Sequence, residues 1–521
     1  MRLRLVTGRG PGRIRFGGSV SSSILVLAAS VSFAQPAPIP GLPLSEAVRL
    51  TLERQPGIKL AEEQLSFVNG SLQTALGAFD VQFGSRLGGA WDRVPLASDA
   101  SRPGLAESRI TSFSYVSEAS KLFKNGLLIT PSISLASGDS NLATFTESRS
   151  VIAFTLRQPL LRGRGEGGVA AASTAVGLDR DATAFDLRHV VSLSVLDTVY
   201  AYWSYLAAVE RMRIVRESED RFAELQEHSE KLLEAREVAA VDLKQLSANV
   251  ARRRISRLQA EQTVFDARVR LGLSVGLDAA SLISMGSPQD PFPSPQSESS
   301  STDVSALIQT ALAERADLRA ARLRQDSVRV AVGAAKNATR ASLDLVVGTS
   351  YSGESERGGV RGFLGPLGDN LRGPSASAAL VFEWPTSNRA ALGRLAENQS
   401  SLRQSGIALA DLERVIGARV ALAVNNVEKS AARLSTARES CDLYREALAA
   451  ERQRLQIGIS SVLDVINTED RLNESLLEAV SAELDYAQSV AALRFETGTL
   501  VQQTANGDEI DFASLTTPPR H

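Results

Sequence analysis

Four stretches of the chain alternate between apolar and polar residues, which is the pattern of β-strands with two different faces. They span about residues 80–93, 150–160, 342–351 and 376–384. The apolar positions include Ile152, Phe154 and Leu156 in the second stretch and Leu380 and Phe382 in the fourth. An apolar face opposite a small or polar face is typical of strands in an outer-membrane barrel, so we expect these five side chains to face lipid. A soluble sheet covered by helices has the same alternation and stays open as an alternative.

The number of strands limits how such a sheet can close. Four principal strands per chain are too few for a closed barrel, which needs about eight. Either several chains share one barrel, or the sheet is open. Residues 95–149 interrupt the first pair of strands, and within them Ile110–Val116 and Leu127–Ala136 are expected to form an additional hairpin that projects from the barrel.

Long helices are predicted where apolar residues recur at alternating spacings of three and four, the seam of a coiled coil. Residues 168–236 contain no proline, and a helix of that length would extend about 100 Å. The three seams are Leu193, Leu196, Tyr200, Trp203 and Ala207; Val420, Val424, Val427, Ala431 and Leu434; and Leu477, Val480, Leu484, Ala487 and Ala491. Cys441 is in register with the second seam and is interpreted as a small core residue.

The order helix, strand, strand, long helix pair occurs twice along the chain, which predicts an internal duplication. The helix beginning at Ser45 resembles the one beginning at Ser305. We therefore expect a first structural repeat over 35–285, a Pro/Ser-rich linker over 286–303, a second repeat over 304–500 and a tail over 501–521. The predicted fold is mainly α with a β-barrel part.

The amino-terminal residues 1–34 have the composition of a secretory signal. Several arginines precede the short apolar stretch Val20–Phe33, and Ser32 and Ala34 occupy the −3 and −1 positions of a small-residue cleavage site. The apolar stretch is too short and too rich in serine to span a bilayer. We expect the mature protein to leave the cytoplasm.

Composition excludes several classes of function. The 521 residues are 43 % apolar, enough for two or more domains, and 57 basic against 59 acidic residues leave a net charge of −2. Such a balance provides no general attraction to nucleic acid, so none is expected as a partner. One cysteine and three widely separated histidines exclude an intrachain disulfide and argue against a metal centre. No Ser/His/Asp set converges on one motif, so neither enzymatic activity nor a cofactor is expected.

A glycine-rich segment, Gly163–Gly168, matches the G-x-G-x-x-G pattern of a dinucleotide-binding turn. That reading requires a parallel strand returning after the helix, and no such strand follows. The segment is therefore interpreted as a flexible turn between a strand and a helix.

Two segments carry a resemblance to the TolC-like outer-membrane factor family, also called the outer membrane efflux protein family. One is Gln-Pro-Leu-Leu-Arg-Gly, from Gln158 to Gly163, directly after a strand. The other runs from Leu455 to Asn467 and precedes a long helix that ends at Gly498. The signal and the duplicated halves extend the resemblance over essentially the whole mature chain.

The resemblance implies a homotrimer in the outer membrane, with a large periplasmic part. It implies a 12-stranded barrel, four strands per chain, standing on a coiled-coil α-helical tunnel. It also implies outer-membrane lipid around the barrel, a periplasmic adaptor (membrane fusion protein) and an inner-membrane pump of the RND, ABC or MFS type as partners.

Candidate site residues follow from the same resemblance. The segment Gly458, Ile459, Ser460 and Ser461 matches the turn at the periplasmic tip, where an adaptor docks. Asp464 matches an aspartate that lines the narrow periplasmic opening, Asp242 occupies the corresponding place in the first half, and Asn467 stands where family members carry a second aspartate. The alternative for both aspartates is an ordinary acid in the first turn of a helix.

The function expected from the sequence is a passive exit duct of a tripartite efflux or type I secretion system. The runner-up is a soluble periplasmic coiled-coil adaptor without a barrel. The alternating strands argue against that second reading.

Overall fold

The computed structural model describes residues 41–95, 107–142, 146–234, 240–295, 303–356, 359–368, 373–504, 507–509 and 515–519. The predicted signal, residues 1–34, lies outside the described residues. The chain forms two compact units, and each takes segments from both halves of the sequence. The sheet unit comprises Gln64–Ala184 and Ala320–Ala410, and the helical unit comprises Met1–Glu63, Phe185–Arg319 and Asp411–His521.

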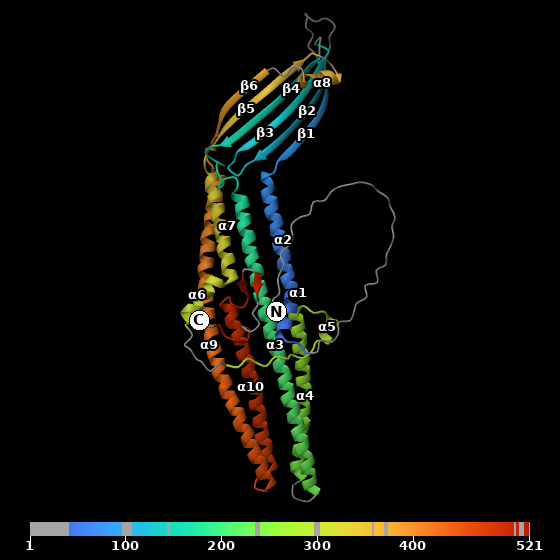
Figure 1. The fold of residues 1–521 in the computed structure, drawn as a ribbon, viewed down its shortest axis with the longest axis vertical. Coiled ribbons are helices and arrows are strands. Elements are labelled where there is room, and N and C mark those ends of the chain that lie inside the picture. The colour runs from blue at the N-terminus through green and yellow to red at the C-terminus, as the bar shows by residue number, and fades with distance from the viewer. Residues whose placement is uncertain are drawn as a thin grey trace, which may run out of the picture. The chain divides into compact units, whose positions relative to one another are not determined.

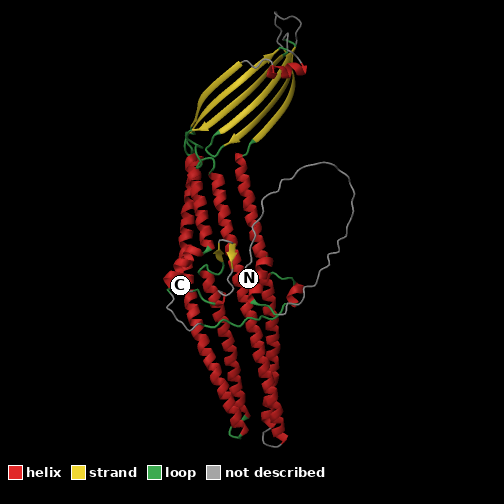
Figure 2. Cartoon of the chain, viewed as in Figure 1, coloured by secondary structure: helices red, strands yellow, loops and turns green. Residues whose placement is uncertain are grey.

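The sheet unit contains one antiparallel sheet of six strands in the order of the sequence (Figures 1 and 2). The strands are β1 (Gln82–Pro95), β2 (Glu107–Leu122), β3 (Leu128–Ser140), β4 (Glu147–Pro159), β5 (Ser342–Ser355) and β6 (Gly373–Glu383). Strands β1, β4, β5 and β6 lie at the four principal stretches of alternation. The described sheet is therefore built from both halves of the chain.

The prediction of four strands per chain and a projecting hairpin is wrong. Strand β1 pairs with β2 along the whole length of β1, from Gln82 opposite Ser120 to Pro95 opposite Glu107, and β3 pairs with β4. The hairpin is a full part of the sheet because its strands are as long as their neighbours and satisfy their backbone hydrogen bonds. The described chain has six strands in this sheet.

The pairing register fixes which side chains share a face, since directly opposed residues point to the same side of a sheet. Ile152 lies opposite Ile133 on one side and Tyr351 on the other. Through β5, the face of Ile152, Phe154 and Leu156 continues to Leu380 and Phe382. The predicted apolar face is therefore one continuous surface, called the apolar face below.

Most of the exposed apolar bulk of the sheet lies on this apolar face. Fifteen large apolar side chains are exposed within the six strands, and eleven of them belong to it. These are Phe83, Leu87, Trp91, Phe113, Ile133, Ile152, Phe154, Val347, Tyr351, Leu380 and Phe382. Leu156 is half-buried.

The opposite face carries small and hydroxyl side chains with a few ion pairs. Ser350 and Ser375 hydrogen-bond across two strands, with 2.6 Å between their hydroxyl oxygens. Arg157 donates to the Asp344 carboxylate, at 3.0 Å from its Nε. We call this surface the polar face.

Both halves of the chain begin with two shorter helices and end with two long ones, and the short helices α5 and α8 occur in one half each. The first half has α1 (Leu44–Arg54), α2 (Pro56–Leu76), the short helix Gly77–Phe79, α3 (Ala171–Glu234), α4 (Ala240–Val275) and α5 (Ala279–Ile283). The second half has α6 (Val304–Glu314), α7 (Ala316–Ala338), α8 (Gly359–Gly368), α9 (Arg389–Gln456) and α10 (Val462–Glu496), followed by the short strands β7 (Gln502–Thr504) and β8 (Gly507–Glu509). None of the helices in the described ranges has a segment long and apolar enough to cross a membrane.

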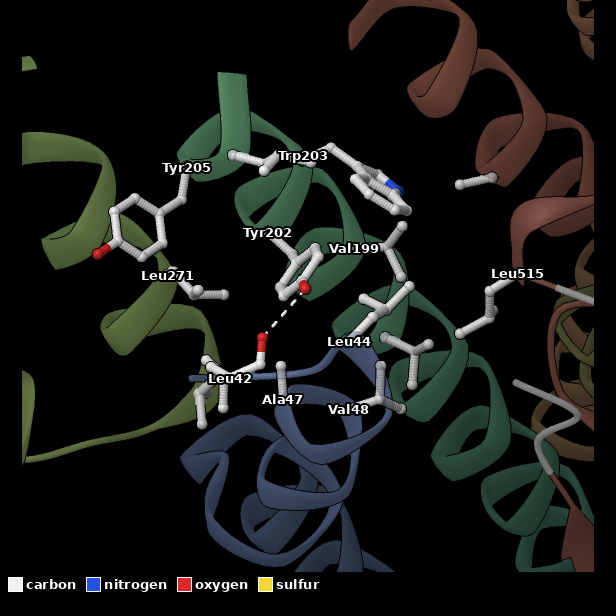
Figure 3. Packing of buried hydrophobic residues seen from close by; sticks show 14 of the residues in the cluster. Leu42, Leu44, Ala47, Val48, Val199, Tyr202, Trp203, Tyr205, Leu271 and Leu515 are labelled. Carbon is white, nitrogen blue, oxygen red and sulfur yellow. Dashed lines mark hydrogen bonds between the residues drawn. The ribbon is translucent and has the colours of Figure 1, made fainter. Parts of the chain in front are cut away.

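The main core of the helical unit forms where α1 packs against α3 (Figure 3). Ala47 and Val48 of α1 belong to the same cluster of buried side chains as Val199, Tyr202 and Trp203 of α3. The Tyr202 hydroxyl donates to the Leu42 carbonyl at 3.0 Å, as the dashed line shows. Burial raises the pKa of Tyr202, so its hydroxyl stays protonated and acts as a donor.

Of the fifteen predicted seam residues, nine are buried, five are half-buried and one, on α3, is exposed. Leu193 is 42 % exposed, while Val195 and Val199 are fully buried. The seam of α3 there follows the positions that face α1, because a helix of 3.6 residues per turn drifts away from a strict heptad. Cys441 is buried, and its thiol donates to the Ser475 carbonyl at 3.1 Å, which confirms it as a core residue.

The segment Gly163–Gly168 is a turn between β4 and α3. Gly163 and Gly165 have positive φ values of 84° and 77°, conformations that glycine adopts without steric cost. All pairs in the six-stranded sheet are antiparallel, so the described chain provides no parallel β-α-β unit here. The strand-to-helix reading of this segment is confirmed.

Candidate functional site

The predicted tip turn joins α9 to α10 and is built by local hydrogen bonds. The Gly458 amide donates to the Leu455 carbonyl and the Ile459 amide to the Arg454 carbonyl, both at 3.0 Å. This pair of bonds is the Schellman ending of a helix, which needs a left-handed residue at the position of Gly458. Gly458 has φ of 76°, so its glycine is required by the turn.

Asp464 is held in the first turn of α10 by a capping box. The Asp464 amide donates to the Ser461 hydroxyl oxygen at 3.2 Å, and the Ser461 amide donates back to the Asp464 carboxylate at 3.2 Å. The Ser461 hydroxyl also donates to that carboxylate at 2.6 Å. These hydrogen bonds from Ser461 lower the pKa of Asp464, so its carboxylate is charged at neutral pH. Asp464 therefore caps the amino-terminal end of α10.

Beyond the cap, an exposed polar stripe follows α10. Asp464, Asn467, Arg471 and Glu474 are all exposed and succeed one another at spacings of three and four. This spacing places them on one side of the helix. The stripe is mixed in charge, because the positive Arg471 lies between the negative Asp464 and Glu474.

Apolar side chains are exposed around the same turn. Ile457 and Ile459 flank Gly458 and are 66 % and 63 % exposed, and Leu463 is 46 % exposed. Ser460, in contrast, donates to the Glu451 carboxylate. Of the four predicted docking residues, Gly458 and the two serines shape the turn, whereas Ile459 is available to a partner.

The first tip lies between α3 and α4. Residues 235–239 are outside the described residues. Asp242 falls in the first turn of α4 by its backbone, but its side chain is not among those described. Its predicted role at the opening remains a prediction.

Behind the second tip, a small apolar cluster joins the two helical hairpins α3–α4 and α9–α10. Phe222 of α3 and Leu246 of α4 contact Val462 and Ile466 of α10, and all four are buried. A neighbouring cluster, Leu448, Val465 and Leu472, joins α9 to α10. The start of α10 is thus packed on three helices.

A network of ion pairs lies next to these clusters, which we call the Glu469 network. Glu469 of α10 has a side chain only 4 % exposed. It accepts from Arg221 of α3 at 2.5 Å and lies 3.5 Å from Arg452 of α9. The neighbouring Asp470 pairs with Arg252 at 3.0 Å and with Arg253, both of α4. Two adjacent acids therefore bind arginines from three other helices.

The Glu469 network is buried enough to change the pKa of one of its arginines. Burial lowers the pKa of Arg253, and the positive charge of Arg252 adds to this effect. The Arg253 guanidinium also stacks 4.8 Å from the centre of the Phe222 ring. A charge buried this way is strongly destabilised when its partner is removed, so the network holds the two hairpins together.

Sequence reasoning missed Glu469, although a signal was present. Val462, Val465, Ile466, Glu469, Leu472 and Asn473 recur at helical spacing and are all buried in α10. An acid on an otherwise apolar stripe is expected to have a buried cationic partner. That pattern would have singled out Glu469 without naming its arginines.

No group of three or more His, Cys, Asp or Glu residues capable of holding a metal ion occurs in the part of the chain that the structure describes.

Comparison with known proteins identifies what this architecture resembles. Residues 307–499 match the family model "outer membrane efflux protein". No curated protein matches the sequence significantly.

Three solved structures have the same fold over most of the chain. The outer-membrane channel OprN has a TM-score of 0.65 at 17 % identity, covering 88 % of this chain and 90 % of that one. The CmeC outer membrane channel of Campylobacter jejuni gives 0.63 at 14 % identity, with 88 % and 85 % covered. The open state of the MtrE outer membrane channel of Neisseria gonorrhoeae gives 0.61 at 16 % identity, with 87 % and 88 % covered.

The TM-scores show a common fold over most of the chain. The family match over residues 307–499 covers most of the second half, including the tip turn and Glu469, but not the arginines of α3 and α4 that bind Glu469 and Asp470. Residues 307–499 are therefore similar to the outer membrane efflux protein family, and the chain as a whole shares its fold with outer-membrane channels.

Proposed function

We propose that the chain forms a homotrimeric exit duct in the outer membrane, as part of an efflux or type I secretion system. The sheet carries this proposal. Its apolar face exposes eleven large side chains, its polar face is lined by small and hydroxyl residues, and its two outer strands have no partner within the described chain. Lipid on one face and water on the other account for both compositions.

A soluble periplasmic adaptor, the second candidate from the sequence, does not need such a sheet. An exposed apolar surface of this extent is rare on a soluble monomer and favours aggregation. In the proposed duct, Ile152, Phe154, Leu156, Leu380 and Phe382 contact lipid.

Cell fractionation with chemical crosslinking tests this proposal. We expect a trimer that needs detergent for its extraction from the outer membrane. A monomer recovered in the soluble periplasmic fraction would contradict the duct and favour the adaptor.

The second tip is proposed to line the narrow periplasmic opening. Three copies would bring three Asp464 carboxylates around one axis, with Asn467 one turn further on and Asp242 contributing from the first tip. A ring of carboxylates favours cations. The arginine that follows on the exposed stripe, Arg471, reduces this preference, so the proposed selectivity is modest.

A pair of substitutions separates the electrostatic role of Asp464 from its capping role. Asp464→Gln keeps a side chain that can reach back to the Ser461 amide but removes the charge, whereas Asp464→Glu keeps both. We expect only the glutamine variant to lose cation preference and block by multivalent cations in planar-bilayer recordings. Equal behaviour of the two variants would leave Asp464 as a helix cap alone.

The exposed apolar residues of the turn are proposed to dock a periplasmic adaptor, which in turn links the duct to an inner-membrane pump of the RND, ABC or MFS type. Ile457, Ile459 and Leu463 provide the contact surface, and Gly458 holds the turn in shape. The duct is passive in this proposal, and the pump supplies the energy.

Substitution of Ile459 by serine tests the docking surface without disturbing the turn. We expect loss of adaptor capture and of efflux while the trimer yield stays constant. Leu443, similarly exposed on α9 at 61 % and more than four helical turns before the tip, is the matched control, and Leu443→Ser should leave adaptor capture unchanged.

A further inference from the structure

We propose that the β2–β3 hairpin forms part of the barrel wall and that β1 and β6 are pairing edges for neighbouring copies of this chain, so that the barrel has 18 strands. The proposal rests on the trimeric duct proposed above, since three copies of six strands make 18. It replaces the 12-stranded barrel expected from the sequence.

The hairpin has every property of its neighbours in the sheet. It is paired continuously on both sides, to β1 and to β4. Phe113 of β2 and Ile133 of β3 are exposed on the apolar face, and the residues beside them, such as Ser112 and Ser134, lie on the polar face. With 16 and 13 residues, both strands exceed the 9–11 residues that a membrane-spanning strand needs.

The hairpin also separates β1 from β4. All described pairings of β1 are with β2, and those of β4 are with β3 and β5. A barrel that left the hairpin outside its wall would need β1 to pair with β4 instead, which the observed register does not allow.

The two edges of the sheet are suited to one another. The strands alternate in direction, so β1 and β6 run antiparallel. The β6 edge of one copy can therefore continue into the β1 edge of the next with the same antiparallel pattern. Unpaired strand edges inside a bilayer are not tolerated, because lipid offers no hydrogen bonds. Six strands cannot close alone, so the wall is incomplete without further copies.

The extra strands set the width of the exit. With strands about 4.8 Å apart and tilted by about 40°, 18 strands give a backbone diameter of about 36 Å, against about 24 Å for 12 strands. Side chains extend about 5 Å inward from each wall, which leaves about 26 Å against about 14 Å. The wider lumen accepts helical polypeptide, since a helix with its side chains is about 10–12 Å across, with room beside it. Sorting of small solutes by size then cannot occur in the barrel.

Distances between spin labels measure this width in the full-length protein. A single label is placed by Thr349→Cys, an exposed position on the apolar face of β5, in a Cys441→Ser background that removes the native thiol. By three-fold symmetry, backbone positions lie about 31 Å apart in an 18-stranded trimer and about 21 Å apart in a 12-stranded one. A second variant joins Pro95 directly to Glu147 through an Asn-Gly turn and lacks the hairpin, which preserves the alternation of strand direction.

The proposal expects a crosslinked trimer with the longer distance, which shortens by about 10 Å in the variant without the hairpin. If that variant fails to assemble, the absolute distance in the full-length trimer decides by itself. A full-length trimer with the shorter distance overturns the 18-stranded barrel while the proposed duct stands. Absence of any trimer from the outer membrane overturns both.

Discussion

The Glu469 network makes a quantitative prediction about the strength of the second tip. Glu469→Gln keeps the size of the side chain but leaves Arg221 without its closest anion. Breaking a buried ion pair costs about 3–5 kcal/mol. The Arg221 side chain is 22 % exposed, and water reduces the cost, so we expect about 2–3 kcal/mol.

Hydrogen exchange of the backbone amides at the start of α10 measures this loss in the intact protein. The exchange rate reports the free energy of local opening. A loss of about 2–3 kcal/mol corresponds to exchange faster by about 30- to 150-fold. Asp442→Asn is the control, since its pair with Arg445 is exposed on both sides and is worth at most about 0.5 kcal/mol.

A double substitution tests whether the pair itself is responsible. If Arg221 and Glu469 act together, Arg221→Gln should add much less in the Glu469→Gln background than it does alone. Additive effects, or exchange no faster than in the Asp442→Asn control, would refute the reasoning that this network holds the hairpins together.

Three further predictions follow from other parts of the structure. Phe154→Arg should abolish most of the assembled trimer, because a charge at the bilayer midplane costs about 2–4 kcal/mol, whereas Thr155→Arg on the polar face should assemble normally; equal yields on a native gel would remove the face assignment. Tyr202→Phe removes the hydroxyl that donates to the Leu42 carbonyl and accepts from the amides of Gln289 and Asp290, so we expect a destabilisation of about 1–3 kcal/mol in chemical denaturation, and an unchanged midpoint would contradict it. Burial alone would raise the pKa of Asp317, but the hydrogen bond and charge of Arg315 outweigh it and lower that pKa. The ionised Asp317 therefore stabilises the folded protein fully above the ordinary pKa of about 3.9, and this contribution is lost as the pH falls through the lowered pKa. Asp317→Asn should make the free energy of unfolding less dependent on pH in that acidic range.

The faces of the strands were predictable from the sequence, but the number of strands in the sheet was not. Alternation places Phe154 and Phe382 on apolar faces regardless of their partners, and the register confirms that they share one surface. Which strands pair with each other depends on which strand edges meet, and the alternation of apolar and polar residues along one strand carries no information about its neighbours. The strands β2 and β3 were recognised as a hairpin, yet their serine-rich polar positions gave no reason to place them inside the sheet.

At the tip, too, structure set by neighbouring residues was predictable from the sequence, whereas contacts between distant segments were not. The turn at Gly458 and the acid at Asp464 depend on hydrogen bonds within ten residues, so their local structure could be read from the sequence. The partners of Glu469 come from helices as far as 248 residues away. Its burial was detectable from helical spacing, but the arginines that bind it were not.

The pairing of β4 with β5 has a consequence for how the chain folds. Strands β1 to β4 follow one another through short connections, whereas Arg157 and Asp344, which pair across β4 and β5, are 187 residues apart. Contacts so distant in sequence form late, because a long loop must close first. A chain that folds after export can complete the four-stranded meander β1–β4 first, and the edge of β4 then stays open until the distant strand β5 reaches it. Unpaired edges of this kind recruit other chains, so the delay between formation of β4 and its pairing with β5 is the interval in which aggregation competes most strongly with assembly.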